Sequence, residues 1–381
     1  MYNLLAYGRM ISNPARFRAY TEALRRMVKP GSVVLDLGTG PGIMALLACR
    51  FGARKVYAIE SSPIIDVARE IAHSNGMAEK IEFIQAVSTE VTLPEAVDVI
   101  VSDLNGTLPW YQHHLSSVVD ARRRFLKPDG VLIPGKENIW IGVVENENAY
   151  SECTQPWETG HGFDMQAARD LATNTPQVLR LKLESLLVQP QCGLVLDFME
   201  LEGTDSKAEV SFIVTRPGIG HGALVWFDCE LGDEISFSNA PGCEKSIYGQ
   251  TFFPWRAPVR LETGDVVRLK LNCSLLADDY TFRWRTEVLA QGNKTDVKAR
   301  FDQSDFHSLP ISMASLRKGA VAYVPRGNGD ASVDSFILQA MDGQASVGQI
   351  AARVSKFFPE KFHAPAEALS RVARVSRNYS D

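Results

Sequence analysis

The chain has 381 residues, of which 45% are hydrophobic and 22% are charged. This length exceeds what one core of ordinary size needs, so it predicts two or three packed units. The formal net charge is -5 and no sustained run of Lys and Arg occurs, which argues against a nucleic-acid partner. No stretch approaches the roughly 18 apolar residues of a membrane span, and no apolar signal region follows the N-terminus, so no membrane partner is expected.

The six cysteines are scattered along the sequence. They form no C-x-x-C pair and have no histidine at metal-ligand spacing, so neither a metal site nor a disulfide framework is predicted. Free thiols are typical of a reducing compartment. The composition therefore predicts a soluble, cytoplasmic protein without a bound metal.

Helical and strand-like segments alternate over the first third of the chain. Strands are predicted at the apolar runs 33–37, 56–60, 81–85, 97–102 and 130–133, with amphipathic helices between them. This alternation is typical of α/β folds with a doubly wound parallel sheet. Residues 1–134 are therefore expected to form the first domain.

The run VLDLGTGPG at residues 34–42 joins a buried strand to a glycine-rich turn that opens a helix. Gly38, Gly40 and Gly42 allow the backbone to approach a ligand closely. Glu60 ends the next predicted strand, where a carboxylate can bind both hydroxyls of a ribose. The turn therefore predicts a nucleotide-like cofactor, the alternative being a tight turn that binds nothing.

The glycine spacing narrows the choice of cofactor. The pattern is G-x-G-x-G rather than G-x-G-x-x-G, because Ile43 stands where a dinucleotide-binding fold has Gly or Ala. This spacing disfavours NAD and FAD. It favours S-adenosylmethionine as the cofactor.

Short β-rich runs separated by Gly, Pro and Asp follow Pro134. They predict an antiparallel barrel or sandwich over residues 135–295. Beyond it, a polar linker leads to predicted helices at 333–341, 346–358 and 365–379. Residues 296–381 are therefore expected to form a linker and a small C-terminal helical domain.

Several runs match one known family in order along the chain. They are YGRMISNPARFRAY (7–20), NGMAEKIEFIQAVSTEVTLPEAVDVIVSD (75–103), VDARRRFLKPDGVLIP (119–134), PWETGHGFDM (156–165) and SIYGQTFF (246–253). Over roughly residues 5–290 the chain resembles the protein arginine methyltransferase family. The resemblance implies a class I methyltransferase sheet, a β-barrel, S-adenosylmethionine as cofactor, and a homodimer formed through an arm near residues 163–175.

The resemblance also implies a cofactor site. Met10 would lie beside the sulfonium and Arg16 on the carboxylate, while Ser88 and Thr89 would flank the adenine. In this segment Tyr7 replaces the family's histidine and Asn13 its aspartate. The complete set of expected cofactor-binding residues is Met10, Arg16, Asp36, Gly38, Thr39, Gly40, Gly42, Glu60, Ser61, Ser88, Thr89 and Asp103.

The acceptor loop departs from the family. The family holds guanidinium with two glutamates on one loop, whereas here the loop reads SDLNGTLPWYQHHL, with Asp103 and Gln112 at those positions. The histidine of the family's T-H-W loop becomes Ile247. Replacing a carboxylate by an amide forfeits a charge-assisted hydrogen bond of about 1.5–3 kcal/mol. Ordinary protein-arginine methylation is therefore expected to be weak or absent.

Four residues are candidates for catalysis. Asp103 would orient the acceptor or accept its proton, unless it only caps the loop. Gln112 would contribute an amide, His113 or the adjacent His114 a general base, and Tyr248 a ring that stacks on the acceptor. The predicted catalytic set is thus Asp103, Gln112, His113 and Tyr248.

Three functions remain open on this reading. The first is transfer of a methyl group from S-adenosylmethionine to an N or O nucleophile of a small metabolite or peptide. The second is arginine N-methylation, of protein or free arginine, with a weakened guanidinium clamp. The third is cofactor binding without catalysis, in a protein that serves as an interaction surface.

The C-terminal helices carry ILQAMDGQASVGQIAARV, at residues 337–354. This run resembles the helical part of PqqD-like peptide-recognition domains, which implies binding of a peptide. The alternative is that its apolar residues only form a small core.

Overall fold

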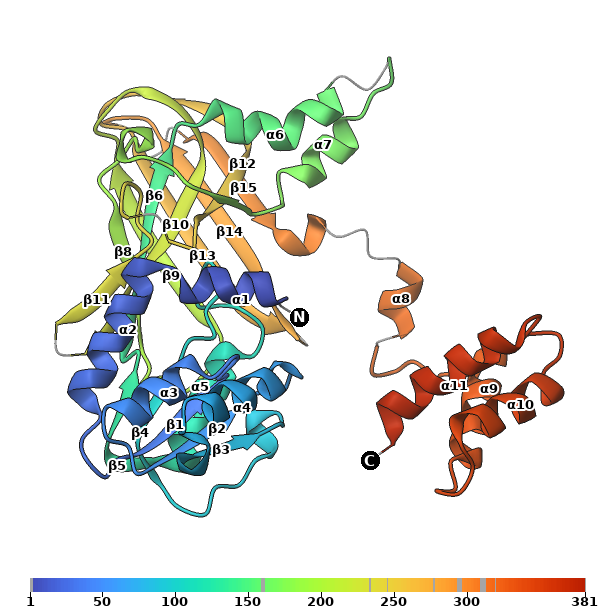
Figure 1. Ribbon diagram of the computed structural model, residues 1–381. Coiled ribbons are helices and arrows are strands. Elements are labelled where there is room, and N and C mark those ends of the chain that lie inside the picture. Colours follow the sequence, from blue (N-terminus) through green and yellow to red (C-terminus); the bar gives the residue numbers. More distant parts are fainter. Residues whose placement is uncertain are drawn as a thin grey trace. The chain divides into compact units, whose positions relative to one another are not determined.

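The computed structural model describes residues 3–158, 162–232, 234–244, 246–276, 278–292, 297–308, 313–318 and 320–380. The chain divides into two compact units, Met1–Leu309 and Pro310–Asp381 (Figure 1). None of the described helices combines the length and apolar character needed to cross a membrane. Within the described ranges no group of three or more acidic, histidine or cysteine residues is arranged to hold a metal ion.

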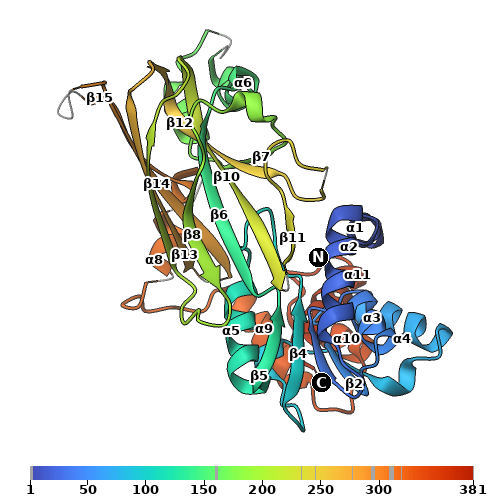
Figure 2. The same ribbon diagram turned by 90° about the vertical axis from the view of Figure 1, so that its left-hand side faces the viewer.

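The first unit begins with two helices and a parallel sheet. Its five strands lie in the order β3-β2-β1-β4-β5, and every neighbouring pair is parallel. Figure 2 shows α5 on one side of the sheet and α3 and α4 on the other, so the sheet is doubly wound as predicted. The elements are α1 (Leu4–Ile11), α2 (Pro14–Met27), β1 (Val33–Leu37), α3 (Ile43–Arg50), β2 (Lys55–Ile59), α4 (Ile64–Ser74), β3 (Ile81–Ile84), β4 (Val97–Ser102), α5 (His114–Phe125) and β5 (Leu126–Ile133).

Strand β1 shows why the sequence forms this sheet. All five of its residues are buried, as expected of a central parallel strand that is covered on both faces. Pairing with β2 and β4 brings the carboxyl ends of the three strands to one edge of the sheet. The loops that follow these strands carry most of the predicted site residues.

An antiparallel barrel follows the parallel sheet. One of its sheets has the order β7-β12-β10-β6-β8, with β11 paired to β10, and the other has the order β15-β14-β13-β9. A single cluster of buried apolar side chains runs through both the parallel sheet and the barrel. The strands are β6 (Lys136–Val144), β7 (Gln177–Leu179), β8 (Gln191–Asp197), β9 (Ser206–Ile213), β10 (Gly218–Gly232), β11 (Ile235–Ser238), β12 (Gln250–Leu261), β13 (Val266–Leu276), β14 (Asp279–Leu289) and β15 (Val297–Ser304).

Strand β15 corrects the predicted domain boundary at residue 295. The segment Val297–Ser304 was expected to be linker, but it pairs with β14 and completes the four-stranded sheet. The strand is at the sheet edge and most of its side chains are exposed or half-buried. The run VKARFD at residues 297–302 nevertheless alternates apolar and charged residues, which is the period-2 pattern of a strand, so the linker prediction overlooked a signal that the sequence contains.

A pair of helices occupies the region of the predicted arm. Helices α6 (Glu147–Glu158) and α7 (Gln166–Ala172) pack together and project from the end of the barrel that lies away from the parallel sheet (Figure 1). The predicted arm near residues 163–175 includes α7 but omits α6. Residues 159–161 of the run PWETGHGFDM lie outside the described residues.

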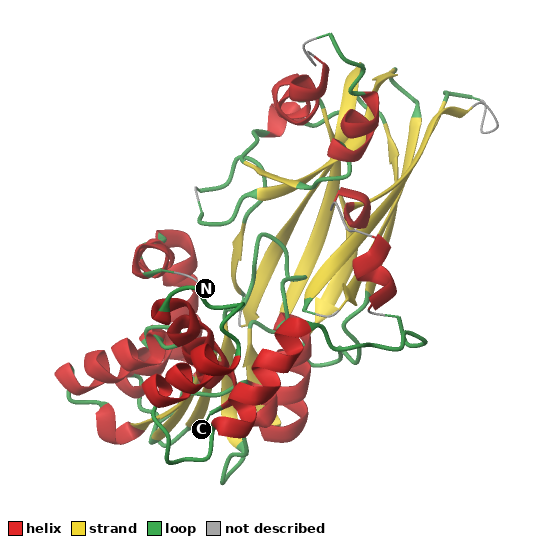
Figure 3. Ribbon diagram, turned by 90° about the vertical axis from the view of Figure 1, so that its right-hand side faces the viewer, coloured by secondary structure: helices red, strands yellow, loops and turns green. Residues whose placement is uncertain are grey.

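The second unit contains the helices α8 (Met313–Lys318), α9 (Gly329–Ala340), α10 (Val347–Phe357) and α11 (Pro365–Tyr379), which are orange to red in Figure 1. Figure 3 shows all helices of the chain in red and its strands in yellow. Helices α9 to α11 agree with the predicted ones to within a few residues at each end. Ser346 begins α10 with a capping box, in which its hydroxyl accepts from the Gln349 N–H and the Gln349 side chain accepts from the Ser346 N–H. The three helices enclose a core of Val333, Ile337, Ile350, Ala351, Val354, Ala368, Val372 and Val375.

Candidate functional site

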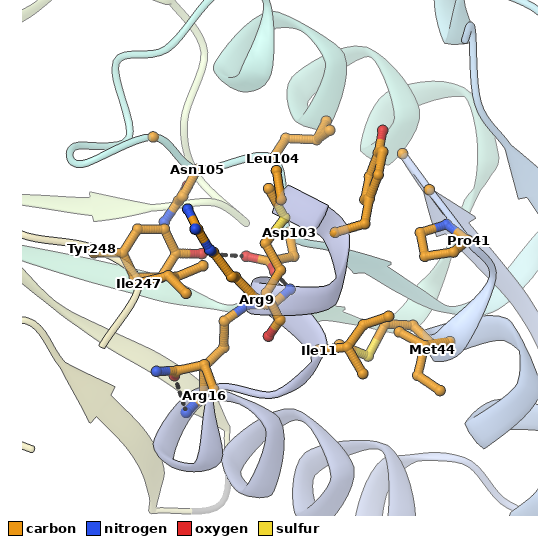
Figure 4. Close-up of a pocket in the computed structure, with 18 of the residues that line it drawn as sticks. Arg9, Ile11, Arg16, Pro41, Met44, Asp103, Leu104, Asn105, Ile247 and Tyr248 are labelled. Atoms are coloured by element: carbon orange, nitrogen blue, oxygen red, sulfur yellow. Dashed lines mark hydrogen bonds and ion pairs between the residues drawn. The ribbon is translucent and has the colours of Figure 1, made fainter. Parts of the chain in front are cut away.

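A cavity of about 1030 Å³ opens at the carboxyl edge of the parallel sheet. Its walls come from α1 and the start of α2, from the loops after β1, β2 and β4, and from the barrel loop 246–248. Figure 4 shows side chains from these separate segments converging on Asp103. Residues far apart in the sequence therefore share one site.

The glycine-rich turn forms one wall of the cavity. Gly38 and Gly40 have φ angles of +75° and +52°, which L side chains rarely adopt. A Cβ at Gly38 would overlap the side chain of Leu104, and one at Gly40 would lie 3.0 Å from the ring of Tyr7. Glycine at these two positions avoids overlap with Leu104 and Tyr7, and both glycines line the cavity.

Gly42 and Asp36 hold the glycine-rich turn in place. Gly42 is absent from the described lining of the cavity, and a Cβ there would lie 3.0 Å from Ala68 Cβ in α4. The buried carboxylate of Asp36 accepts from Thr39 Oγ1 at 2.5 Å and from Ala45 N at 2.9 Å. Burial raises the pKa of Asp36 to about 7. These contacts fix the path of the turn.

Glu60 lies where a ribose-binding carboxylate is expected. Its two carboxylate oxygens accept from Gly40 N at 3.1 Å and from Ser62 N at 2.9 Å, which fixes the side chain at the cavity edge. Ser61 also lines the cavity. The carboxylate and the exposed backbone of the turn together suit a nucleoside.

Arg16 is a buried cation beside the cavity, 6% exposed. Its guanidinium forms an ion pair with Asp103 and donates to the Met10 carbonyl at 3.0 Å. Its Nε finds no acceptor among the described residues, although the atom is buried. A buried donor without a partner costs about 1–3 kcal/mol, so the site suits a ligand carboxylate at this point.

Tyr20 and Tyr248 hold Asp103 from two sides. Tyr248 donates its hydroxyl to Asp103 Oδ1 at 2.9 Å, and Tyr20 donates to the Ser102 carbonyl at 3.0 Å and to Asp103 Oδ1 at 3.4 Å. Burial raises the pKa of both phenols above the usual value, so both remain protonated donors. Together with Arg16 they occupy much of the hydrogen-bonding capacity of Asp103. Figure 4 shows the hydrogen bond between Tyr248 and Asp103.

The loop after β4 presents two amides to the cavity. Gln112 adopts a φ of +45° and lines the cavity, while its backbone N–H donates to Asp279 Oδ1 at 3.4 Å. Asn105 also lines the cavity, and its amide donates to the buried carboxylate of Glu137 on β6. Burial raises the pKa of Glu137 to about 7. Position 112 carries an uncharged amide and not a carboxylate.

Besides Gly42, three predicted site residues lie outside the described lining of the cavity. Ser88 and Thr89 belong to a short 3-10 turn, where the Ser88 carbonyl accepts from Arg124 at 2.8 Å. His113 is exposed and its Nε2 lies 3.4 Å from Asp278 Oδ1, because the chain turns at Gln112 before α5 begins. The predicted contact of Ser88 and Thr89 with adenine stays a prediction, whereas His113 is directed to Asp278 and does not line the cavity.

His114 shows why the neighbouring histidine is also unsuited to proton transfer. It is buried and its Nδ1 lies 3.0 Å from the Pro109 carbonyl. Burial lowers its pKa to about 4. The second histidine of the loop therefore serves packing.

Sequence reasoning missed four residues of the site. Arg9 and Arg180 line the cavity, Tyr20 binds Asp103, and Glu137 binds Asn105. Tyr20 lies four residues after Arg16 on α2, a helical spacing that places both on one face. Glu137 and Arg180 carried no local signal, because β6 and the segment after β7 reach the site only through the barrel fold. Arg9 directly precedes the predicted residue Met10 on α1.

Comparison with known proteins identifies two families along the chain. Residues 19–134 match the ribosomal protein L11 methyltransferase (PrmA) family, and residues 136–288 match the arginine methyltransferase oligomerization subdomain. Protein arginine N-methyltransferase 1 of Schizosaccharomyces pombe is 30% identical over 278 residues, 69% of this chain and 80% of that protein. Protein arginine N-methyltransferase PRMT10 of Oryza sativa subsp. japonica is 30% identical over 316 residues, 72% of this chain and 83% of that protein.

Solved structures show the same fold. Protein arginine methyltransferase 10 of Arabidopsis thaliana superposes with a TM-score of 0.70 at 24% identity, over 79% of this chain and 97% of that one. The Trypanosoma brucei PRMT1 enzyme-prozyme complex with AdoHcy gives 0.71 at 24% identity, over 78% of this chain and 97% of that one.

The parallel sheet with its glycine-rich turn and the methyltransferase match over residues 19–134 define an S-adenosylmethionine-dependent methyltransferase. The relatives narrow this class, because the proteins from S. pombe and rice are 30% identical and share four fifths of their length with the chain. The chain belongs to the protein arginine N-methyltransferase family.

Proposed function

We propose that the protein methylates an N or O nucleophile of a small metabolite or peptide other than a protein arginine. The observation that carries this proposal is the state of the two positions that hold guanidinium in the family. Asp103 is already bonded to Arg16 and Tyr248, and the second position is Gln112, an uncharged amide.

The residues at the glycine-rich turn would hold the cofactor. Arg16 would bind its carboxylate, Glu60 the ribose hydroxyls, and Gly38 and Gly40 would admit the nucleoside, with Met10 in the adjoining wall. Bound S-adenosylmethionine supplies an electrophilic methyl group on sulfur. Beyond that, the protein mainly has to align the acceptor and exclude water.

Asp103 and Tyr248 would act on the acceptor. Asp103 lies on the cavity with a side chain 9% exposed, where its carboxylate can orient an N–H or O–H group or accept its proton. Tyr248 donates to the same carboxylate, which holds it in one orientation. Gln112 and Asn105 add amide groups that suit a polar, uncharged acceptor edge.

Arginine N-methylation is the second candidate. The curated relatives named above are protein arginine N-methyltransferases, and this favours the arginine activity more strongly than it favours any other acceptor. One carboxylate, that of Asp103, still faces the cavity. On this alternative Asp103 and Gln112 form a weakened clamp.

The double substitution Asp103→Glu with Gln112→Glu separates the two candidates. If arginine is the native acceptor, restoring both carboxylates raises methylation of an arginine-rich peptide by on the order of tenfold or more, since each charge-assisted bond contributes about 1.5–3 kcal/mol. Our proposal predicts no arginine product for the native chain and loss of activity on its own acceptor in the variant. Glu230→Gln is a control, because Glu230 is exposed on β10 and does not line the cavity.

The third candidate, cofactor binding without catalysis, is an outcome of the same assay. Tight binding of S-adenosylmethionine without label in any acceptor fraction would support it. Methyl transfer to any acceptor removes it.

We further propose a separate role for each part of the chain. Residues 1–134 bind the cofactor, the barrel that follows shapes the acceptor side and carries the arm, and the helices of the second unit form a separate domain. The described cysteines form no disulfide, which supports the expected cytoplasmic location.

A further inference from the structure

Two arginines on the wall of the cavity form no ion pair with a described residue. The charged residues that line the cavity within the described ranges are Arg9, Arg16, Asp36, Glu60, Asp103 and Arg180. The three carboxylates and Arg16 are each engaged by groups described above. Arg9 and Arg180 are the two charged lining residues that have no carboxylate partner among the described residues.

Each carboxylate that lines the cavity already has partners within the protein. Asp36 is buried under the turn, where its carboxylate accepts from Thr39 Oγ1 and Ala45 N. Glu60 accepts from two backbone N–H groups at the predicted ribose position. Asp103 is paired with Arg16. All three carboxylates therefore already have hydrogen-bond or ion-pair partners within the protein.

Arg9 and Arg180 approach the acceptor end from two different elements. Arg9 is in the last turn of α1, and Figure 4 shows its side chain directed toward the end of the cavity where Asn105, Ile247 and Tyr248 lie. Arg180 follows β7 and donates to the carbonyls of Ser246 and Ile247, at 3.3 and 3.1 Å. Both arginines are exposed, and neither forms an ion pair with a described residue.

We propose that Arg9 and Arg180 bind an anionic group, a carboxylate or a phosphate, on the methyl acceptor. This inference rests on the proposed function and names the class of its substrate. An arginine guanidinium presents the planar donor fork that suits both groups. The same two cations repel a guanidinium group. They therefore favour an acceptor other than arginine.

Ion-exchange fractionation tests the charge of the acceptor directly. A small-molecule and peptide extract of the protein's own source is split into anionic, neutral and cationic fractions before any reaction. Each fraction is then incubated with the protein and methyl-labelled S-adenosylmethionine. Label is expected to enter the anionic fraction. Label confined to the neutral or cationic fractions, or no label in the anionic one, overturns the inference.

The double variant Arg9→Gln with Arg180→Gln tests the residues. For the labelled anionic compound, KM is expected to rise at least about tenfold while kcat changes little, because the two cations bind the acceptor without touching the reacting atoms. Arg25→Gln on α2 is the matched control, since Arg25 pairs with Glu22 and does not line the cavity. An unchanged KM in the double variant also overturns the inference.

Calorimetric binding of S-adenosylmethionine separates failure of this inference from failure of the proposed function. A chain that does not bind the cofactor, or transfers no label to any fraction, contradicts the methyltransferase itself. A chain that binds it and labels only uncharged or cationic compounds remains a methyltransferase. In that case only the proposed binding of an anionic acceptor group by Arg9 and Arg180 is refuted.

Discussion

Single residues decide what this site accepts. Arg16, Glu60 and Gly38 line the cavity where our proposal places the cofactor, and the amide of Gln112 lines it where our proposal places the acceptor. Asp103 is held by a cation and a phenol within the protein. The methyl-transfer function can therefore persist while the acceptor differs from that of the relatives.

Glu137 predicts a pH dependence of stability. Its side chain is 0% exposed and its pKa is raised from 4.5 to about 7 by burial, so folding favours the protonated acid. The contribution is present below pH 4.5 and is lost as pH rises through about 7, by about 3 kcal/mol. Glu137→Gln stays neutral, so its free energy of unfolding relative to the native chain should rise by about that amount over this range.

Urea unfolding of both proteins at several pH values measures this difference. Asp36, whose pKa is also raised, is present in both chains and cancels in the comparison. The control Glu230→Gln changes an exposed carboxylate beside Cys229, the strand partner of Glu137, and should shift stability by less than about 0.5 kcal/mol at every pH. Parallel curves for the native chain and Glu137→Gln would refute the account of Glu137.

At the scale of elements, the strand-to-helix turn was the most predictable part of the site. Its glycines and the strand before it are contiguous, so the sequence contains all the information that the turn needs. Glu60 could be predicted because parallel strands end at one edge of a sheet. Arg180 and Glu137 could not, since their positions depend on pairing between strands that are distant in sequence. Strand β15 pairs with the preceding strand β14, and its alternating run at residues 297–302 was a signal that the prediction missed.

The turn itself can be tested with two alanine substitutions. Gly38→Ala and Gly76→Ala both introduce a Cβ at positive φ, +75° and +67°. Only the Cβ at Gly38 meets a neighbour, Leu104, whereas nothing lies within 4 Å of that at Gly76. Gly38→Ala is expected to weaken binding of S-adenosylmethionine at least about tenfold in calorimetry, while Gly76→Ala leaves it unchanged. Equal affinities would mean that the turn does not contact the cofactor.

At the scale of the whole molecule, the match to the oligomerization subdomain points to assembly. We propose a homodimer formed through the arm, whose described apolar side chains include Phe163, 77% exposed, and Leu171, 51% exposed. Exposed apolar surface of this kind is typical of an interface. Light scattering should give twice the 42.1 kDa chain mass.

Charged substitutions test the arm. Phe163→Asp with Leu171→Asp should produce a monomer, because a buried interface does not tolerate unpaired carboxylates. Leu276→Asp is the control, as Leu276 is 58% exposed at the end of β13, away from the arm. A monomeric native chain, or an unchanged mass in the double variant, would rule out this interface.

The most direct test of the account is to follow the methyl label of S-adenosylmethionine in the native protein. Arginine-rich peptides, free arginine and an extract of the protein's own source are offered in parallel, and each product is separated and counted. The account predicts label in a small-molecule or peptide product that contains no methylated arginine. Methylarginine as the main product would contradict it and establish the activity for which the relatives are named.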